Sequence, residues 1–414
     1  MSRDRAALGC LLALGAVWLV YAPYAEFVLD DWYLYQKLQQ ADRQGWRAEW
    51  KLAGALVQNT VWGAFRTTWM GHLAVLALSQ LLGARPALYF LLSVAAHAGA
   101  GYLLYLTLAR LGSGTRLAFL AGTLWILLPT ARNPVFWFPT CATYVLSAFW
   151  FLLYLYLVAG TVEQGGLGAR STAVQVLTLI LALFSTDQIF GLLVSGALAM
   201  AILWRSRAAL ASTLLAWGTV AGAAFVYLRF VNRAAVGDSV TARLEFTWGR
   251  VAENLGRIWS DYQRLSGGGD SYYRLAGIGW GALAALEAAA LVFWRLYLGV
   301  QGETRQRRAG PASFVLFGAG LWAAGYGATW FLRWRELRYD YLPSLGLAVA
   351  WAAVAAAVLE RAPRPWMAAG GAALAGWGSA GLVAEIQQCW RPQAESARAI
   401  RDEVLRLRRS AITT

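Results

Sequence analysis

Apolar stretches of about 20 residues recur along the chain between residue 6 and residue 386. Two examples are LGCLLALGAVWLVYAPYAEFV at 8–28 and LLSVAAHAGAGYLLYLTLA at 91–109, which are apolar on every face of a helix. A helix needs about 20 such residues to span a membrane, whereas membrane β-barrels show alternating segments of about 10 residues. The pattern therefore predicts an all-α fold, a polytopic integral membrane helical bundle.

The composition agrees with a membrane chain. Of the 414 residues, 59% are hydrophobic and only 14% are charged, and the mean hydropathy is +0.47. Soluble domains average about 45–50% apolar and about 25% charged residues. The net charge of +14 could indicate nucleic acid as a partner. The arginines lie in short connections rather than on a predicted soluble surface, so we exclude nucleic acid.

These arginines also predict the orientation, because the cytoplasmic loops of membrane proteins are enriched in Lys and Arg. Counting apolar stretches between the arginine-bearing connections favours about eleven spans within residues 1–387. The first span is expected at 6–28 and the second at 86–109. The N-terminus is then inside and the C-terminus outside.

Three segments are expected on the outer side of the membrane. Residues 29–85 form a first external loop with interfacial helices, in which 69–84 is barely long enough to cross and is expected to lie on the membrane surface. Residues 232–274 form a long external loop, which could be a mobile lid or a flexible connection. Residues 388–414 predict a basic amphipathic helix.

Candidate chemistry gathers on this outer side. Asp30 and Asp31 directly follow the first predicted span, and a carboxylate at a helix centre would cost about 2.5–3.5 kcal/mol. They could be a solvated helix end, or one could act as general base on a hydroxyl, or both could bind a cation. Asp187 lies in a predicted turn and could be a helix N-cap. Arg338 could reach lipid phosphate as an anchor, or hold a substrate phosphate with its planar fork.

These motifs resemble the GT-C glycosyltransferases, which take sugars from polyprenyl-phosphate carriers. The pair Asp30 and Asp31 looks like the first-loop motif of protein O-mannosyltransferases and aminoarabinose transferases. Residues 65–111 are similar in layout to the membrane part of transmembrane and tetratricopeptide-containing O-mannosyltransferases, and His97 stands where those sequences carry a histidine. The segment RYDYLPSLGLAV at 338–349 resembles their Arg-Tyr-Leu-Tyr-Leu-Pro-Ser segment.

Other motifs depart from the family pattern. Ser93 replaces an asparagine, and LLPTARNPVFWF at 127–138 replaces a His-Pro signature that is followed by a glutamate. STDQIF at 185–190 takes the place of a Lys-Glu turn, with Asp187 at the acid and no lysine. Tetratricopeptide repeats are absent. The matching motifs nevertheless occur in the expected order over about residues 20–345.

The resemblance implies an inverting membrane glycosyltransferase on the outer face of the cytoplasmic membrane. Its donor would be a polyprenyl-phosphate sugar, and its acceptor a hydroxyl on a glycan, lipid or protein. Asp30 would be the base, with Asp31 as its support or its substitute, and Arg338 the phosphate partner. Asp187 would be a second acid near the acceptor or a cation, and a divalent cation is left open because some relatives use one. The remaining candidates for substrate binding are Tyr339, Arg335 and His97, the last of which could equally be a hydrogen-bonded residue inside the bundle.

Two other functions fit the same residues. A lipid or sugar transporter, or a flippase, would use the acids and Arg338 to bind a carried substrate. Transporters of this kind often show internal repeats and interrupted helices at the membrane midplane, and the sequence shows neither. A non-catalytic scaffold with a GT-C-like fold would leave Asp30 exposed to solvent, away from any cavity.

Overall fold

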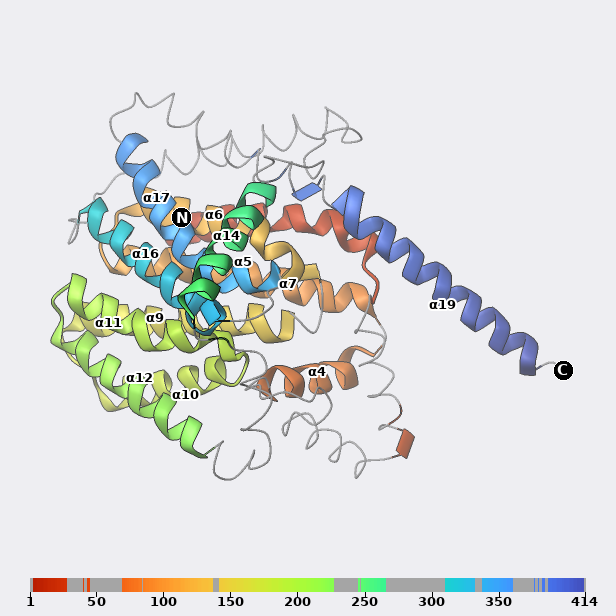
Figure 1. Cartoon of the computed structure of the whole chain (residues 1–414), viewed down its shortest axis with the longest axis horizontal. Helices are drawn as coiled ribbons and strands as arrows, with labels where there is room; N and C mark the ends of the chain where they lie inside the picture. Colours follow the sequence, from red (N-terminus) through yellow and green to blue (C-terminus); the bar gives the residue numbers. More distant parts are fainter. Residues whose placement is uncertain are drawn as a thin grey trace.

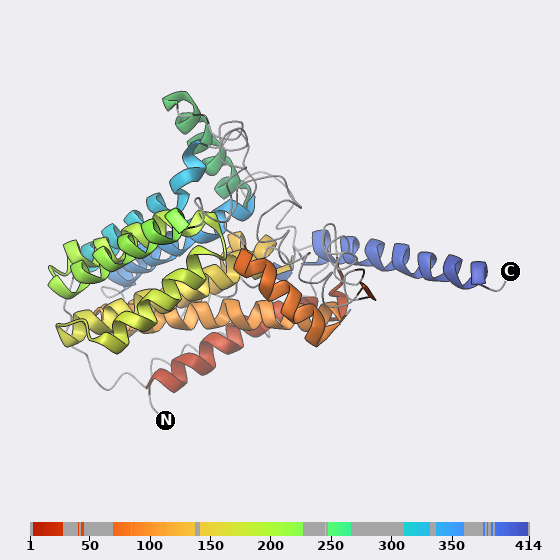
Figure 2. The ribbon, with the colours of Figure 1, turned by 90° about the horizontal axis from the view of Figure 1, so that it is seen from below.

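All of the elements that the structure, a computed structural model, describes are helices (Figure 1; Figure 2). The described residues are 3–27, 40, 43–44, 69–83, 85–136, 141–226, 245, 247–265, 310–331, 337–359, 376, 379, 382–383 and 386–412. No strand occurs within these ranges, as the all-α prediction requires.

Several described helices have the character of membrane spans. Four are long and apolar enough to cross a membrane, namely Asp4–Tyr24, Pro86–Arg110, Cys141–Gln164 and Tyr341–Val358. Three further apolar helices are shorter, namely Thr115–Leu127, Ala169–Leu183 and Phe190–Leu203. These helices agree with the predicted membrane bundle by their length and composition, while the count of about eleven spans and the orientation stay predictions.

The first of these helices ends earlier than the sequence pattern predicted. It consists of α1 (Arg3–Gly15) and the 3₁₀ helix η1 (Ala16–Tyr24). Pro23, which lies inside η1, has no N–H to donate to a preceding carbonyl, so the helix is weakened at this point. The chain leaves the helix after Tyr24, and residues 25–27 have no helical structure.

The helices pack side by side as a bundle. In addition to α1, its main members in chain order are α5 (Pro86–Arg110), α6 (Thr115–Leu127), α9 (Leu146–Gln164), α10 (Ala169–Leu183), α11 (Phe190–Leu203), α12 (Arg207–Val226), α16 (Pro311–Tyr326) and α17 (Tyr341–Leu359). α5 contacts α1, α6 and α9, while α10 contacts α9 and α12. α11 contacts α12 and α16, and α17 joins α16 to α6. Figure 1 and Figure 2 show α9, α10, α11 and α12 running lengthwise through the molecule.

Glycines allow α16 and α17 to approach closely. A Cβ atom added to Gly318 would lie 2.5 Å from the backbone nitrogen of Ala350, and one added to Gly346 would overlap the backbone of α16. Small residues at such crossings are typical of membrane helices, because close backbone contact replaces the hydrophobic driving force that lipid removes.

The two ends of the bundle differ. At one end, here called the arginine end, lie the turns that carry Arg110 and Arg205. Trp204 Nε1 donates to the carbonyl oxygen of Leu111 at 3.0 Å there, and Arg110 Nε lies 4.0 Å from Glu163 Oε2. At the opposite end, here called the Glu26 end, lie the end of η1, the start of α5 and the short helices η4 (Asp187–Ile189), η6 (Gly327–Phe331) and η7 (Leu337–Asp340).

Three helices lie outside the lengthwise bundle. α4 (Trp69–Leu82) matches the predicted helix at 69–84 and contacts the π-helix η3 (Cys141–Val145), while its position on a membrane surface stays a prediction. α14 (Trp248–Leu265) falls within the predicted external loop. α19 (Arg391–Ile412) covers most of the predicted C-terminal helix and projects from the bundle in both views (Figure 1; Figure 2).

Candidate functional site

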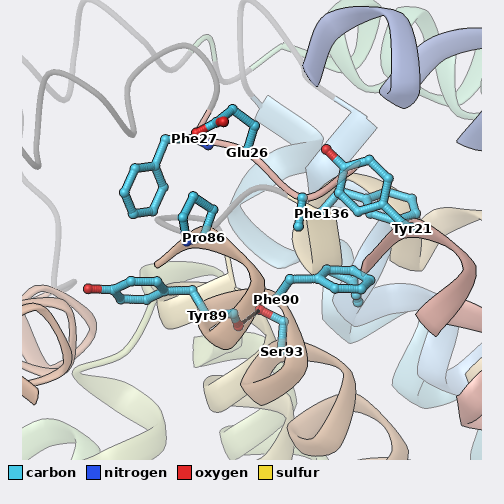
Figure 3. Close-up of a pocket in the computed structure, with 10 residues that line it drawn as sticks. Tyr21, Glu26, Phe27, Pro86, Tyr89, Phe90, Ser93 and Phe136 are labelled. Atoms are coloured by element: carbon cyan, nitrogen blue, oxygen red, sulfur yellow. Dashed lines mark hydrogen bonds between the residues drawn. The ribbon is translucent and has the colours of Figure 1, made fainter. Parts of the chain in front are cut away.

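A recess opens at the Glu26 end, between the end of η1, the first turns of α5 and the short helix α7 (Arg132–Phe136). It encloses about 270 Å³, open solvent included. Most of this volume is open to solvent, and the space enclosed between the side chains is that of about one water molecule, so the recess is shallow. Ten residues line it: Tyr21, Ala25, Glu26, Phe27, Pro86, Tyr89, Phe90, Ser93, Val135 and Phe136. Figure 3 shows Glu26 between Phe27 on one side and Tyr21 and Phe136 on the other.

The local sequence explains why a carboxylate is brought to this place. The N–H of Ala25 bonds back to the carbonyl oxygen of Ala22 at 3.3 Å, and the chain then turns away from the helix axis. Glu26 therefore leaves the apolar helix and faces the start of α5. Pro86 is at the first position of α5, where its fixed φ favours a helix and its missing N–H costs no bond.

Aromatic rings form the walls. The ring of Tyr21 lies edge-on to Phe90 and Phe136, with centroids 5.1 and 4.8 Å apart, and Phe90 stacks on Phe136 at 5.8 Å. Phe27 lies edge-on to Tyr89 at 5.4 Å, and the Tyr89 hydroxyl donates to the carbonyl oxygen of Gly83 at 2.8 Å. Edge-to-face and offset-stacked pairs of this kind fix ring orientation, so the recess keeps its shape without a ligand.

Glu26 carries the charge of the recess. Its side chain is only 2% exposed, and its Oε2 lies 2.6 Å from Arg401 Nη1 and 3.7 Å from Arg398 Nε. The N–H of Phe27 donates to Oε1 at 3.2 Å. A buried carboxylate requires such partners, because its lost hydration must be replaced by an opposite charge and hydrogen bonds. The two arginines come from α19, and Arg401 is 375 residues further along the chain than Glu26.

The first turns of α19 form the rim beside this carboxylate. The guanidinium of Arg391 lies 4.8 Å from the ring centroid of Tyr24, and Arg398 Nη2 donates to the carbonyl oxygen of Pro23 at 3.4 Å. Trp390, just before α19, packs on Phe136 with centroids 4.8 Å apart. The C-terminal helix is therefore anchored at the recess.

Several predicted site residues fall outside the described residues. Asp30 and Asp31 belong to them, as does Arg335. Asp30 follows Phe27, a wall residue of the recess, by three positions in the sequence.

Two predicted residues lie on short helices at the Glu26 end. Asp187 begins η4, which contacts η6, and Arg338 lies in η7, which contacts α7. Their side chains are outside the described part of the structure. Tyr339 in η7 is buried, and the neighbouring Asp340 accepts a hydrogen bond from the Tyr326 hydroxyl at 2.5 Å. The turn with Arg338 is thus connected to the recess through α7, whose last residues line it.

His97 lies inside the bundle rather than in the recess. It is fully buried, and its Nδ1 is 2.9 Å from the Tyr341 hydroxyl, while its Nε2 is 3.2 Å from the carbonyl oxygen of Ile126. Both ring nitrogens therefore have partners in the protein. The ring also lies edge-on to Trp18, with centroids 5.5 Å apart, and the rings of Trp18 and Phe136 lie 5.2 Å apart. His97 therefore packs on a residue that contacts the wall of the recess.

Sequence reasoning missed Glu26. The stretch 8–28 was read as apolar on every face, although Glu26 lies within it. The sequence does contain a signal for this residue, because an acid at the centre of a membrane helix costs about 2.5–3.5 kcal/mol. Such an acid therefore needs a partner of opposite charge. That partner, Arg401, is so distant in the sequence that no local pattern could identify it.

Metal ligands do not cluster within the described residues. No group of three or more His, Cys, Asp or Glu side chains that could hold a metal ion is found among them. The acid pair Asp30 and Asp31, the pair that we expected to bind a cation if one is used, lies outside this part of the chain.

No protein-family model, no curated protein and no solved structure matches the chain, so its chemistry is inferred from the residues that line the recess and from the motifs beside it.

Proposed function

We propose that the chain is a membrane-embedded glycosyltransferase. It transfers a sugar from a polyprenyl-phosphate donor to an acceptor hydroxyl on the outer face of the cytoplasmic membrane. The observation that carries the proposal is the buried carboxylate of Glu26 in an aromatic recess, next to a membrane helix and four residues before Asp30, the first of the acid pair. Ionisable groups are expensive in such a place and are retained mainly where they serve a function.

The recess has the chemistry that a sugar requires. The C–H faces of a sugar ring pack against aromatic rings, and its hydroxyls donate hydrogen bonds to carboxylates. Tyr89 and Phe136 supply rings on opposite sides, and the Glu26 carboxylate between them is paired with Arg401, so a sugar hydroxyl would approach it from the open side of the recess. Binding sites typically combine an apolar lining with few polar groups that fix orientation. In this proposal the sugar ring binds against the open side of the recess, while the polyprenyl chain stays in the membrane.

The reaction is a single displacement at the anomeric carbon. The acceptor oxygen forms a new bond to this carbon while its proton passes to the carboxylate of Asp30. The bond between the anomeric carbon and the phosphate oxygen breaks, and polyprenyl phosphate leaves with the electron pair. Arg338 opposes the charge of this leaving group with its planar fork of donors. Attack from the face opposite the phosphate inverts the configuration.

The remaining residues take supporting roles. Asp31 supports or replaces Asp30, and Asp187 binds the acceptor or a cation. Arg335 and Tyr339 belong to the same donor-binding segment as Arg338. A divalent cation, if one is used, would be held by the acid pair.

The test is transfer by purified protein in lipid vesicles that contain a polyprenyl-phosphate sugar. Asp30→Asn keeps the size of the side chain but removes its proton affinity, so donor binding should persist while single-turnover transfer falls about 10²- to 10⁴-fold. Arg338→Ala should weaken both donor binding and transfer, because the phosphate is present in the bound donor and in the transition state. Arg338→Lys should restore only part of each, since a point charge does not reproduce the fork.

Asp31→Asn is the matched control that shows which carboxylate is the base. Undiminished transfer by the Asp30→Asn, Asp31→Asn double variant would refute catalysis by the acid pair. Donor binding by the parent protein without any transfer, measured over a range of acceptors, would favour a carrier instead.

A further inference from the structure

The helix α14 (Trp248–Leu265) has three distinct faces. Successive residues of an α-helix are rotated by about 100°, so residues spaced by three, four and seven positions share a face. One face of α14 is buried against the bundle, a second is charged, and a third is apolar and exposed.

The buried face fixes α14 to the Glu26 end. Asn254 is fully buried, and its side-chain amide donates to the carbonyl oxygens of Trp330 at 2.9 Å and Thr329 at 3.4 Å, both in η6. Ile258, one turn further, is also buried. Because η6 directly follows α16, this contact holds α14 at the end of a bundle helix.

The charged face is linked by ion pairs. Arg250 pairs with Glu245 at 2.7 Å and with Glu253, and Arg257 pairs with Glu253 at 2.5 Å. The side chains of Arg257 and Glu253 are each 43% exposed. A face of this kind is stable in water.

The third face of α14 is apolar and exposed, and no described residue covers it. Trp248 is 86% exposed, Trp259 is 66% exposed and Leu255 is 43% exposed. Their spacing places these three residues on one stripe, and Arg257 lies nine residues after Trp248, about 180° around the helix. The apolar and charged stripes are thus on opposite sides of α14, with the contact to η6 between them.

The direction of α14 relative to the bundle helices suggests where its apolar and charged faces lie in the membrane. In both views α14 runs across the lengthwise direction of the bundle helices (Figure 1; Figure 2). Exposed apolar side chains on the neighbouring bundle helices, such as Leu316 on α16 and Trp351 on α17, form the surface that lipid covers in a membrane protein. A helix that crosses the ends of the spans, with tryptophans opposite its charges, has the features of an interfacial helix.

We propose that α14 lies in the interface of the lipid bilayer at the Glu26 end, with Trp248, Leu255 and Trp259 in the region between headgroups and acyl chains. The charged face of Arg250, Glu253 and Arg257 points to water. The partner of the apolar face is the phospholipid surface of the same membrane that the bundle crosses. This inference rests on the faces of α14 and does not depend on the proposed transferase activity.

Spin labels on single cysteines can test the proposal. Cys10 and Cys141 are buried, and Cys389→Ser removes the third cysteine. Labels are attached in this background at Leu255→Cys and Trp259→Cys on the apolar face, and at the control positions Glu253→Cys and Arg257→Cys on the charged face. The full-length protein is reconstituted in phosphatidylcholine and phosphatidylglycerol vesicles. Collision rates with oxygen, which enriches in lipid, are compared with those of a water-soluble nickel complex.

The proposal predicts that the ratio of oxygen to nickel collisions is higher at both apolar positions than at both charged positions. This difference in collision ratio between the apolar and the charged positions should disappear when the protein is held in a lipid-free amphipol. High nickel collisions at all four positions would mean that the apolar face is in water, and would overturn the proposal. Low collisions with both reagents at the apolar positions would mean that a protein surface covers this face, and would equally overturn it.

Discussion

Replacing Arg401 by alanine should detach the first turns of α19 from the bundle. Arg401 is the closest cationic partner of the buried Glu26 carboxylate, at 2.6 Å, and Arg398 is more distant at 3.7 Å. In the Arg401→Ala variant the carboxylate stays buried with a weaker partner. The docked position of α19 therefore loses its main electrostatic support.

The magnitude follows from the exposure of the two side chains. Glu26 is 2% exposed and Arg401 is 34% exposed, so the pair is intermediate between a surface pair and a fully buried one. Surface pairs contribute about 0.2–1 kcal/mol, and breaking a fully buried pair costs about 3–5 kcal/mol. Since Arg398 remains and water reaches Arg401, we expect a loss of about 1–2 kcal/mol, or a factor of about 5–30 in the ratio of docked to undocked helix.

Hydrogen exchange measures this ratio directly. The amides of residues 391–402 should exchange about 5–30 times faster in Arg401→Ala than in the parent protein. Arg406→Ala is the matched control, because Arg406 is 70% exposed and, among the described residues, its ion pair is with Glu403 in the same helix. It should leave the exchange of these amides unchanged.

A double-mutant cycle separates the pair from other effects. In a Glu26→Gln background the charge is gone, so Arg401→Ala should cause a much smaller further increase in exchange. Equal effects of Arg401→Ala with and without Glu26, or identical exchange in Arg401→Ala and Arg406→Ala, would refute the reasoning.

The remaining predictions concern the bundle and its orientation. Gly346→Ala should force α16 and α17 apart and lower the free energy of unfolding by about 1–3 kcal/mol, measured by thermal unfolding in detergent, because its Cβ would overlap the backbone of α16. Gly222→Ala, with nothing within 4 Å of the added Cβ, is the control, and equal destabilisation would contradict the packing. His97→Ala should cost about 2–4 kcal/mol in the same assay by leaving buried groups without partners, and an unchanged midpoint would refute the buried network. A reporter fused at Thr414 should be active only outside the cytoplasm, and cytoplasmic activity would break the predicted topology.

Within the described residues, the sequence predicts the all-helical secondary structure and several of the individual helices. Long apolar segments have few alternatives to helices in a membrane, so the second span at 86–109 agrees with α5 within one residue. The predicted helix at 69–84 corresponds to α4 (Trp69–Leu82). The end of the first span was placed too late, because hydropathy averages over the local effect of Pro23.

The candidate site is harder to predict from the sequence than the helices are. The apolar stretch at the N-terminus predicts where the first span ends, and Asp30 and Asp31 directly after it are the acids that the sequence predicts for the site. The recess itself depends on contacts between Glu26, Phe136 and Arg401, which come from distant segments. Neither the ion pair nor the burial of His97 between α6 and α17 has a local signature, because both arise from packing between helices.

The most direct test of the proposed sugar site is photolabelling of the reconstituted protein with a polyprenyl-phosphate sugar that carries a diazirine on the sugar ring. The account predicts labelled peptides from the walls of the recess, at 21–27, 86–93 or 135–136, and loss of this labelling when unmodified donor is added in excess. Competed labelling confined to the turns with Arg110 and Arg205 at the arginine end, or the absence of any competed labelling, would contradict it.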